Sequence, residues 1–214
     1  VENSAGRQNR LERATAMATI TQSYVHGAST VPLLGDTLGA YFDSAVARWR
    51  DELALVVRHQ QVRWSYGELA RRVDAFAAGL LALGLEPGDR IGIWSPNNAE
   101  WVITQFATAK AGLILVNINP AYRLAELEYA LNKVGCKALI TADSFKTSDY
   151  VGMLRELAPE LDTCAPGSLK AALLPSLAAV IRIGADARRG MYRFDDVMTA
   201  GDERHIRRLT ELAG

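Results

Sequence analysis

Residues 88–140 read GDRIGIWSPNNAEWVITQFATAKAGLILVNINPAYRLAELEYALNKVGCKALI, and this stretch decides the fold. Short apolar runs at residues 90–94, 113–116 and 137–141 alternate with segments whose apolar residues recur at helical spacing. Strands that alternate with helices over short connections are typical of a parallel sheet covered by helices. We therefore predict an α/β fold with a sheet that is rich in parallel strands and has helices on both faces.

Capping residues predict where the flanking helices begin. Asp36 is expected to cap a helix over residues 38–49. Ser65 and Glu68 have the spacing of a capping box, and the helix that they open is expected to end at Gly84. These boundaries place two helices ahead of the alternating stretch.

Inside the alternating stretch, the first helix follows a turn in which Asn97 and Glu100 have capping spacing. The second helix is expected to end at Gly135, because glycine readily adopts the left-handed conformation that stops a helix. The apolar face predicted for the first helix consists of Trp101, Val102, Gln105, Phe106 and Ala109.

Elements outside this stretch follow from the same patterns. Two runs joined by a short polar turn, residues 53–57 and 62–64, predict a β-hairpin. The further expectations, in chain order, are a helix around residues 150–157, an irregular segment at 162–176, a strand at 178–183, and short helices around Val197 and at 206–212.

The domain organisation is predicted to be simple. No linker-like composition interrupts residues 24–214, which are expected to form one domain. Residues 1–23 lack a core-forming pattern and are expected to be disordered or derived from an expression tag, with Met17 as a candidate natural start. A transit peptide is the alternative; Arg7, Arg10 and Arg13 favour it, whereas Glu2 and Glu12 disfavour it.

Bulk composition excludes several classes of protein. The 214 residues contain 24 Lys plus Arg and 24 Asp plus Glu, a balance that disfavours nucleic-acid and membrane-surface partners. No apolar run approaches the ~20 residues of a membrane-spanning helix. Cys136 and Cys164 are far apart and the three histidines are isolated, so neither a disulfide framework nor a metal site is predicted. Free cysteines favour a reduced, cytoplasm-like compartment.

A search for catalytic patterns finds no complete active site. The chain has no GxxxxGK[ST] phosphate loop, no GxGxxG after a strand and no GxSxG elbow. The missing glycines disfavour a dinucleotide-binding domain. The scattered carboxylates are interpreted as solvated helix faces; they are Glu126, Glu128, Asp149 and Glu156.

The segment at residues 117–122, Asn-Ile-Asn-Pro-Ala-Tyr, follows a strand at the end of the sheet where ligand sites are usually built. Pro120 ends the strand, and Tyr122 can pack its ring and use its hydroxyl. We favour a structural role for this loop over a substrate contact. Trp94 and Trp101 are likewise interpreted as packing residues rather than as pocket walls.

The same sequence resembles the amino-terminal part of acyl-CoA synthetases, which belong to the AMP-binding, adenylate-forming superfamily. The shared features, in order, are Gly-Asp-Arg opening a strand, a Pro-Asn turn, a tryptophan-bearing helix, an Ala-Gly step, Asn-Pro-Ala-Tyr and Glu-Leu-Glu-Tyr. Flanking segments resemble the branch that acts on medium-chain fatty acids; they lie at residues 24–27, 32–35, 146–147 and 164–170. The resemblance covers nearly all of residues 24–214 and implies the amino-terminal subdomain of that fold.

The resemblance also implies a chemistry. At full length, such a ligase activates a fatty acid with ATP and Mg²⁺ to an acyl-adenylate and then transfers the acyl group to coenzyme A. The family's phosphate loop, metal-binding turn and carboxy-terminal lysine have no counterpart among these 214 residues. We therefore assign no catalytic, cofactor-binding or metal-binding residue, and expect a fragment that stops before the phosphate loop and is inactive alone.

A fragment of this kind has further implied partners. These are the fatty acid, the remainder of its own chain and, because an apolar face would be left uncovered, a second copy in a homo-oligomer. The alternative function is a stand-alone, non-catalytic interaction module. A cytoplasmic location is expected, with the mitochondrial matrix as the alternative.

Overall fold

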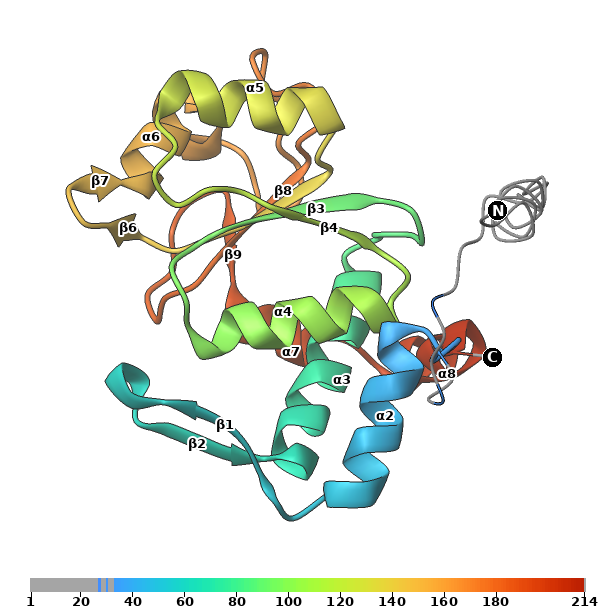
Figure 1. The fold of residues 1–214 in the computed structure, drawn as a ribbon. Helices are drawn as coiled ribbons and strands as arrows, with labels where there is room; N and C mark the ends of the chain where they lie inside the picture. Colours follow the sequence, from blue (N-terminus) through green and yellow to red (C-terminus); the bar gives the residue numbers. More distant parts are fainter. Residues whose placement is uncertain (1–26, 28–29, 31–32, 214) are drawn as a thin grey trace, which may run out of the picture. The chain divides into compact units, whose positions relative to one another are not determined.

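The computed structural model describes residues 27, 30 and 33–213, and residues 36–214 form one compact unit (Figure 1). The expectations for residues 1–23, including the tag and the transit peptide, lie outside the described residues. So does the predicted domain boundary at residue 24. Within the described part of the chain, no helix has the length and apolar character needed to cross a membrane.

A five-stranded parallel sheet forms the centre of this unit (Figure 1). The strand order is β4-β3-β5-β8-β9, and each neighbouring pair is parallel. The α/β prediction is confirmed, although the short edge strand β9 was not predicted. The strands are β3 (Arg90–Trp94), β4 (Ile114–Asn117), β5 (Ala138–Thr141), β8 (Ala179–Arg182) and β9 (Met191–Arg193).

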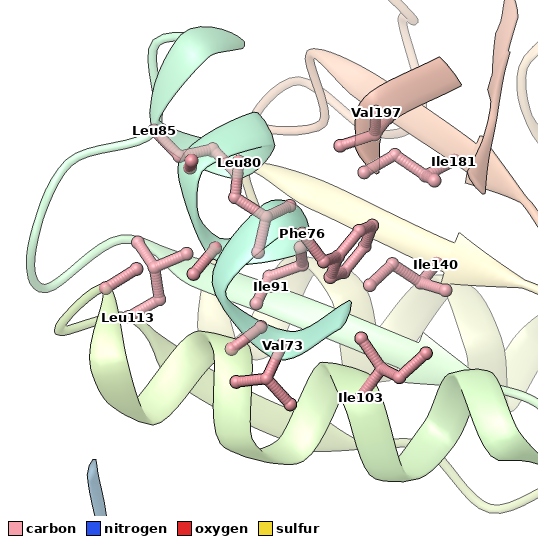
Figure 2. Packing of buried hydrophobic residues seen from close by; sticks show 14 of the residues in the cluster. Val73, Phe76, Leu80, Leu85, Ile91, Ile103, Leu113, Ile140, Ile181 and Val197 are labelled. Carbon is pink, nitrogen blue, oxygen red and sulfur yellow. The ribbon is translucent and has the colours of Figure 1, made fainter. Parts of the chain in front are cut away.

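One face of the sheet is covered by α3 (Tyr66–Ala82), α4 (Ala99–Lys110) and α7 (Phe194–Ala200). Figure 2 shows Phe76 of α3 at the middle of this layer, beside isoleucines from the strands. The Phe76 ring stacks on Phe194 with 4.0 Å between ring centroids. Strand side chains alternate between the two faces of a sheet, so every second residue of β3, β5 and β8 points into this core.

The opposite face is covered by α5 (Leu124–Val134) and α6 (Tyr150–Leu157). Gly135, at φ 63°, ends α5 as predicted. The prediction of helices on both faces is therefore confirmed. Two small elements extend this layer: a hairpin of β6 (Ser144–Phe145) with β7 (Ser148–Asp149), and the 3₁₀ turn η2 (Pro159–Asp162).

The remaining elements pack around the first face. The predicted hairpin is confirmed as the antiparallel pair of β1 and β2. Lys110 of α4 ties helices together, because its ammonium group contacts Asp43 at 2.7 Å and Asp74 at 2.5 Å. The elements are α2 (Leu38–Trp49), β1 (Leu53–Val57), η1 (Arg58–Gln60), β2 (Val62–Ser65) and α8 (Glu203–Ala213).

Two predicted helix caps are wrong by one residue. Thr37, not Asp36, caps α2, and its hydroxyl accepts a hydrogen bond from the Ala40 amide. Asn98, not Asn97, caps α4 through a 2.8 Å bond from the Trp101 amide. In both places adjacent residues of similar capping ability compete, and sequence spacing does not separate them. The Ser65–Glu68 capping box is confirmed.

The apolar face predicted for α4 is confirmed only in part, because Trp101, Val102 and Phe106 pack against the core without being fully buried. The fully buried residues of α4 include Ile103, Thr104, Ala107 and Thr108, whereas Trp101, Val102 and Phe106 are half-buried. The two threonines reach the interior because their hydroxyls donate to backbone carbonyls one turn earlier, at 2.8 Å each. A hydrophobicity pattern counts threonine as polar and so misses this face.

Candidate functional site

Ligand sites in parallel sheets usually lie at the carboxyl ends of the strands. Trp94, the last residue of β3, is fully buried there, and its ring stacks on Tyr150 with 3.6 Å between centroids. The indole N–H of Trp94 donates to the Asn119 carbonyl at 3.2 Å. The prediction that Trp94 is a packing residue is confirmed.

The loop at residues 117–122 is fixed by contacts with this aromatic pair. The Tyr150 hydroxyl donates to the Pro120 carbonyl, and the side chain of Asn119 accepts from the Ala121 amide at 2.9 Å. Burial raises the pKa of Tyr150 to about 12, so the hydroxyl remains a hydrogen-bond donor at neutral pH. The polar groups at Asn119, Pro120 and Ala121 are thus engaged with the protein itself, which supports the structural interpretation of the loop.

A charged cluster lies at the ends of two other strands. Arg182, the last residue of β8, is fully buried, and its Nη1 donates to the Asp143 carboxylate that follows β5. Its Nη2 donates to the Asp186 carbonyl. The buried Nε of Arg182 has no hydrogen-bond partner. The isoleucines on either side of Arg182 are a signal that sequence reasoning overlooked, because a charge inside an apolar strand is costly unless it is paired.

This cluster closes the loop over the end of β8. Gly184 passes so near to Arg182 that a Cβ at position 184 would lie 2.5 Å from Nη1. The Asp143 carboxylate neutralises the guanidinium, and the geometry provides a clamp rather than a nucleophile with its base. Chemically, the cluster can fix strand ends and orient the loop.

Two surface grooves offer space for a larger partner. The first, of about 470 Å³, lies between β4 and α5. The second, of about 460 Å³, lies between β1 and the start of α4 and includes exposed His59 and half-buried Trp101. The first groove is lined by Val116, Asn117, Ile118, Tyr122, Ala125, Glu126, Tyr129, Ala130, Lys133 and Val134.

The carboxylates singled out in the sequence do not converge. Asp149 caps α6 by accepting from the Gly152 amide at 2.9 Å, and Glu126 accepts from the Arg123 amide at 3.1 Å. Glu156 is exposed and Glu128 is half-buried. Across the part of the chain that the structure describes, no group of three His, Cys, Asp or Glu side chains could hold a metal ion.

Cysteines and histidines also lie apart. Cys136 and Cys164 are both free, and burial raises the pKa of the Cys136 thiol to about 11. His205 accepts a hydrogen bond from the Asp202 amide at its Nδ1. His26 lies outside the described residues. Among the described cysteines and histidines, none is arranged as an activated nucleophile.

Comparison with known proteins gives one consistent family. The family described as AMP-binding enzyme matches residues 42–182. Medium-chain acyl-CoA ligase ACSF2, mitochondrial, of Danio rerio is 43% identical over 202 residues, which are 94% of this chain and 33% of that protein. The protein of the same name in Pongo abelii is 46% identical over 188 residues, which are 87% of this chain and 30% of that protein.

A solved structure shows the same fold. The anthranilate CoA ligase AuaEII, in complex with anthranoyl-AMP, superposes with a TM-score of 0.66 at 20% identity. The superposition covers 82% of this chain and 30% of that ligase. This chain therefore spans about a third of the length of the curated relatives that it matches.

Proposed function

This chain belongs to the AMP-binding enzyme family, and we propose that it forms the amino-terminal part of an acyl-CoA ligase acting on medium-chain fatty acids. The observation that carries the substrate class is the identity of 43% to 46% with medium-chain acyl-CoA ligases over most of this chain. The solved neighbour at 20% identity supports the fold and carries no argument about substrate.

The proposed reaction of the whole enzyme has two steps. The fatty-acid carboxylate attacks the α-phosphorus of ATP, which forms an acyl-adenylate and releases pyrophosphate. The thiol of coenzyme A then attacks the acyl carbon, and AMP leaves. Both steps bring anions together, so the enzyme must stabilise negative charge on phosphoryl oxygens.

The described residues do not fit a magnesium site, because no cluster of three candidate ligands exists among them. We assign no step of the reaction through a metal to this part of the chain. Its proposed role is to provide a rigid scaffold whose strand ends are fixed by the Trp94–Tyr150 stack and the Arg182–Asp143 clamp. We expect the 214-residue chain alone to be inactive.

Isotope exchange between ATP and pyrophosphate tests the proposal on the whole protein that contains this chain. Hexanoate, octanoate, decanoate, palmitate and anthranilate serve as the series of acids. We expect the fastest exchange with one of the medium-chain acids and no exchange with the 214-residue chain. Faster exchange with anthranilate or palmitate contradicts the substrate class, and no exchange with any acid contradicts the ligase itself.

We further propose the mitochondrial matrix as the compartment, because the named relatives are described as mitochondrial. The test is imaging of the whole protein fused to a fluorescent protein at its carboxyl end, with and without residues 1–23. Matrix fluorescence that is lost on deletion supports the proposal and the transit-peptide interpretation together. Cytoplasmic fluorescence of both forms supports the cytoplasmic alternative instead.

A further inference from the structure

One edge of the sheet is formed by β4, and the other edge is formed by β9. Among the described strands, β4 pairs with β3. The amides of Ile114 and Ile118 donate to carbonyls at positions 89 and 93, on the β3 side. Backbone groups alternate in direction along a strand. The N–H and C=O groups of Leu115 and Asn117 therefore point to the open edge, as a template for another strand.

The same edge is apolar on the side of α5. Ile114, Val116 and Ile118 lie on one face of β4 and its continuation, and Ile114 is 46% exposed. The groove of about 470 Å³ separates this row from α5. Tyr129 projects from α5 at the groove, and it is 67% exposed. Exposed aromatic and aliphatic side chains that gather around a groove are typical of an interaction surface.

The groove contains one acidic and one basic side chain at symmetric positions along α5. Glu126 and Lys133 both line it, and they lie at equal distances along α5 from the midpoint between Tyr129 and Ala130. Ala125 and Val134, which also line the groove, are related by the same midpoint. A twofold axis through that point would place each glutamate opposite a lysine.

We propose that the β4–α5 surface, defined as the outer edge of β4 and the groove face of α5, binds a second copy of this chain across a twofold axis. An isologous contact requires a surface that is complementary to itself, and the paired charges of α5 satisfy that requirement. This inference does not depend on the proposed ligase activity.

The geometry of the proposed dimer follows from the strand. The twofold axis is perpendicular to the sheet and passes midway between Val116 and Val116 of the partner subunit. The two β4 strands then run antiparallel. Leu115 then exchanges both backbone hydrogen bonds with Asn117 of the partner subunit. The two α5 helices lie on one face of a continuous sheet, also antiparallel, so Glu126 meets Lys133 of the partner subunit.

Sedimentation velocity over a concentration series tests this contact. We compare the 214-residue chain with Lys133→Glu, with the double variant Glu126→Lys/Lys133→Glu, and with Lys170→Glu, an exposed lysine outside the groove. We expect Lys133→Glu to raise the dimer dissociation constant by at least ~10-fold, because like charges then face each other. The double variant should recover dimerisation, and Lys170→Glu should match the unchanged chain.

Several outcomes would overturn the proposal. One is an unchanged chain that sediments as a monomer at all concentrations; the groove would then be available to the remainder of a longer chain. Equal weakening by Lys133→Glu and Lys170→Glu is another, since it would reflect net charge alone. A double variant that keeps its circular dichroism spectrum but fails to dimerise is a third.

A second measurement covers the case in which the double variant loses its fold, because Glu126 also caps α5. Val116 faces its own copy at the axis, where Cα atoms of a non-hydrogen-bonded pair are ~4.5 Å apart, within reach of a disulfide. Mild oxidation of Val116→Cys should give a covalent dimer. The control Leu53→Cys, at an exposed position on β1, should not. No excess of dimer with Val116→Cys would overturn the proposal.

Discussion

The two faces of the parallel sheet are closed by different kinds of contact. On the α3 side, the layer around Phe76 and Phe194 is filled chiefly by aliphatic and aromatic side chains. On the α5–α6 side, the central pair is Trp94 and Tyr150, whose polar tips bind the carbonyls of a loop. One face therefore chiefly supplies apolar burial, whereas the other also fixes the loop at residues 117–122 at the strand ends.

The largest expected effect comes from emptying the apolar face. Phe76 is fully buried, and Phe76→Ala should lower the free energy of unfolding by about 3–5 kcal/mol, through lost transfer energy and a cavity. Denaturation by guanidinium chloride measures it. Phe145→Ala, at a half-buried position beyond that core, is the matched control and should cost less than half as much. Equal losses in the free energy of unfolding would contradict the larger contribution expected from the α3 face.

The next effect tests how closely α3 and α7 approach each other on that face. A Cβ at Gly79 would lie 1.8 Å from the Val197 carbonyl oxygen, so Gly79→Ala forces α7 to move. We expect a loss of about 1–3 kcal/mol, despite the better helix propensity of alanine. In Gly39→Ala the new methyl meets the Lys110 Cγ at 3.3 Å, which requires a shift of only a few tenths of an ångström, so this variant should lose less stability than Gly79→Ala. Thermal unfolding of both variants checks this, and a stabilised Gly79→Ala would refute the close approach.

A smaller effect is expected from removing a hydrogen bond on the other face of the sheet. Tyr150→Phe keeps the stack on Trp94 and leaves the Pro120 carbonyl without its donor. We expect a loss of about 1–2 kcal/mol. Tyr41→Phe, at an exposed position on α2, should change stability by less than about 0.5 kcal/mol. If the two variants unfold at the same urea concentration, the hydrogen bond from Tyr150 to the loop contributes nothing to stability.

The smallest expected effect is the loss of stability at the onset of alkaline pH, near pH 10. Burial raises the pKa of Tyr150 to about 12, above its ordinary value, so the unfolded chain loses this proton first as pH rises. Stability should therefore fall as pH rises from about 10 to 12, and at pH 10 itself Tyr150 accounts for a loss of only about 0.4 kcal/mol. Lys110, whose pKa is raised by its bonds to Asp43 and Asp74 against the effect of burial, acts in the same direction.

Comparison of variants isolates that contribution. Tyr150→Phe should lose stability less steeply than the unchanged chain in alkaline urea titrations. Parallel curves for the two proteins would show that the buried hydroxyl does not titrate with unfolding.

The sequence predicted the repeating architecture well because periodicity and turn residues act locally. The strand Arg90–Trp94 and the Ser65–Glu68 box are confirmed residue by residue. The cap at Asn98 and the buried threonines of α4 were missed, since they depend on hydrogen bonds that only the folded chain defines. The edge strand β9 was missed because it has only three residues.

The candidate site was harder to predict than the fold. The loop at residues 117–122 was correctly placed at a strand end, but its anchor, Tyr150, lies 30 residues away from Pro120 in sequence. The Arg182–Asp143 pair spans 39 residues and joins two strands. Contacts of that range depend on the packing of helices on the sheet, which a single sequence does not specify.

The strand order has a consequence for synthesis on the ribosome. Of these five strands, β3 emerges from the ribosome first and is joined on one side by β4. β5 then pairs with the other side of β3, β8 pairs with β5, and β9 pairs with β8. No new strand has to insert between two that are already paired. The sheet can therefore grow in step with translation, from the amino-terminal strands onward, without reopening a ladder of hydrogen bonds.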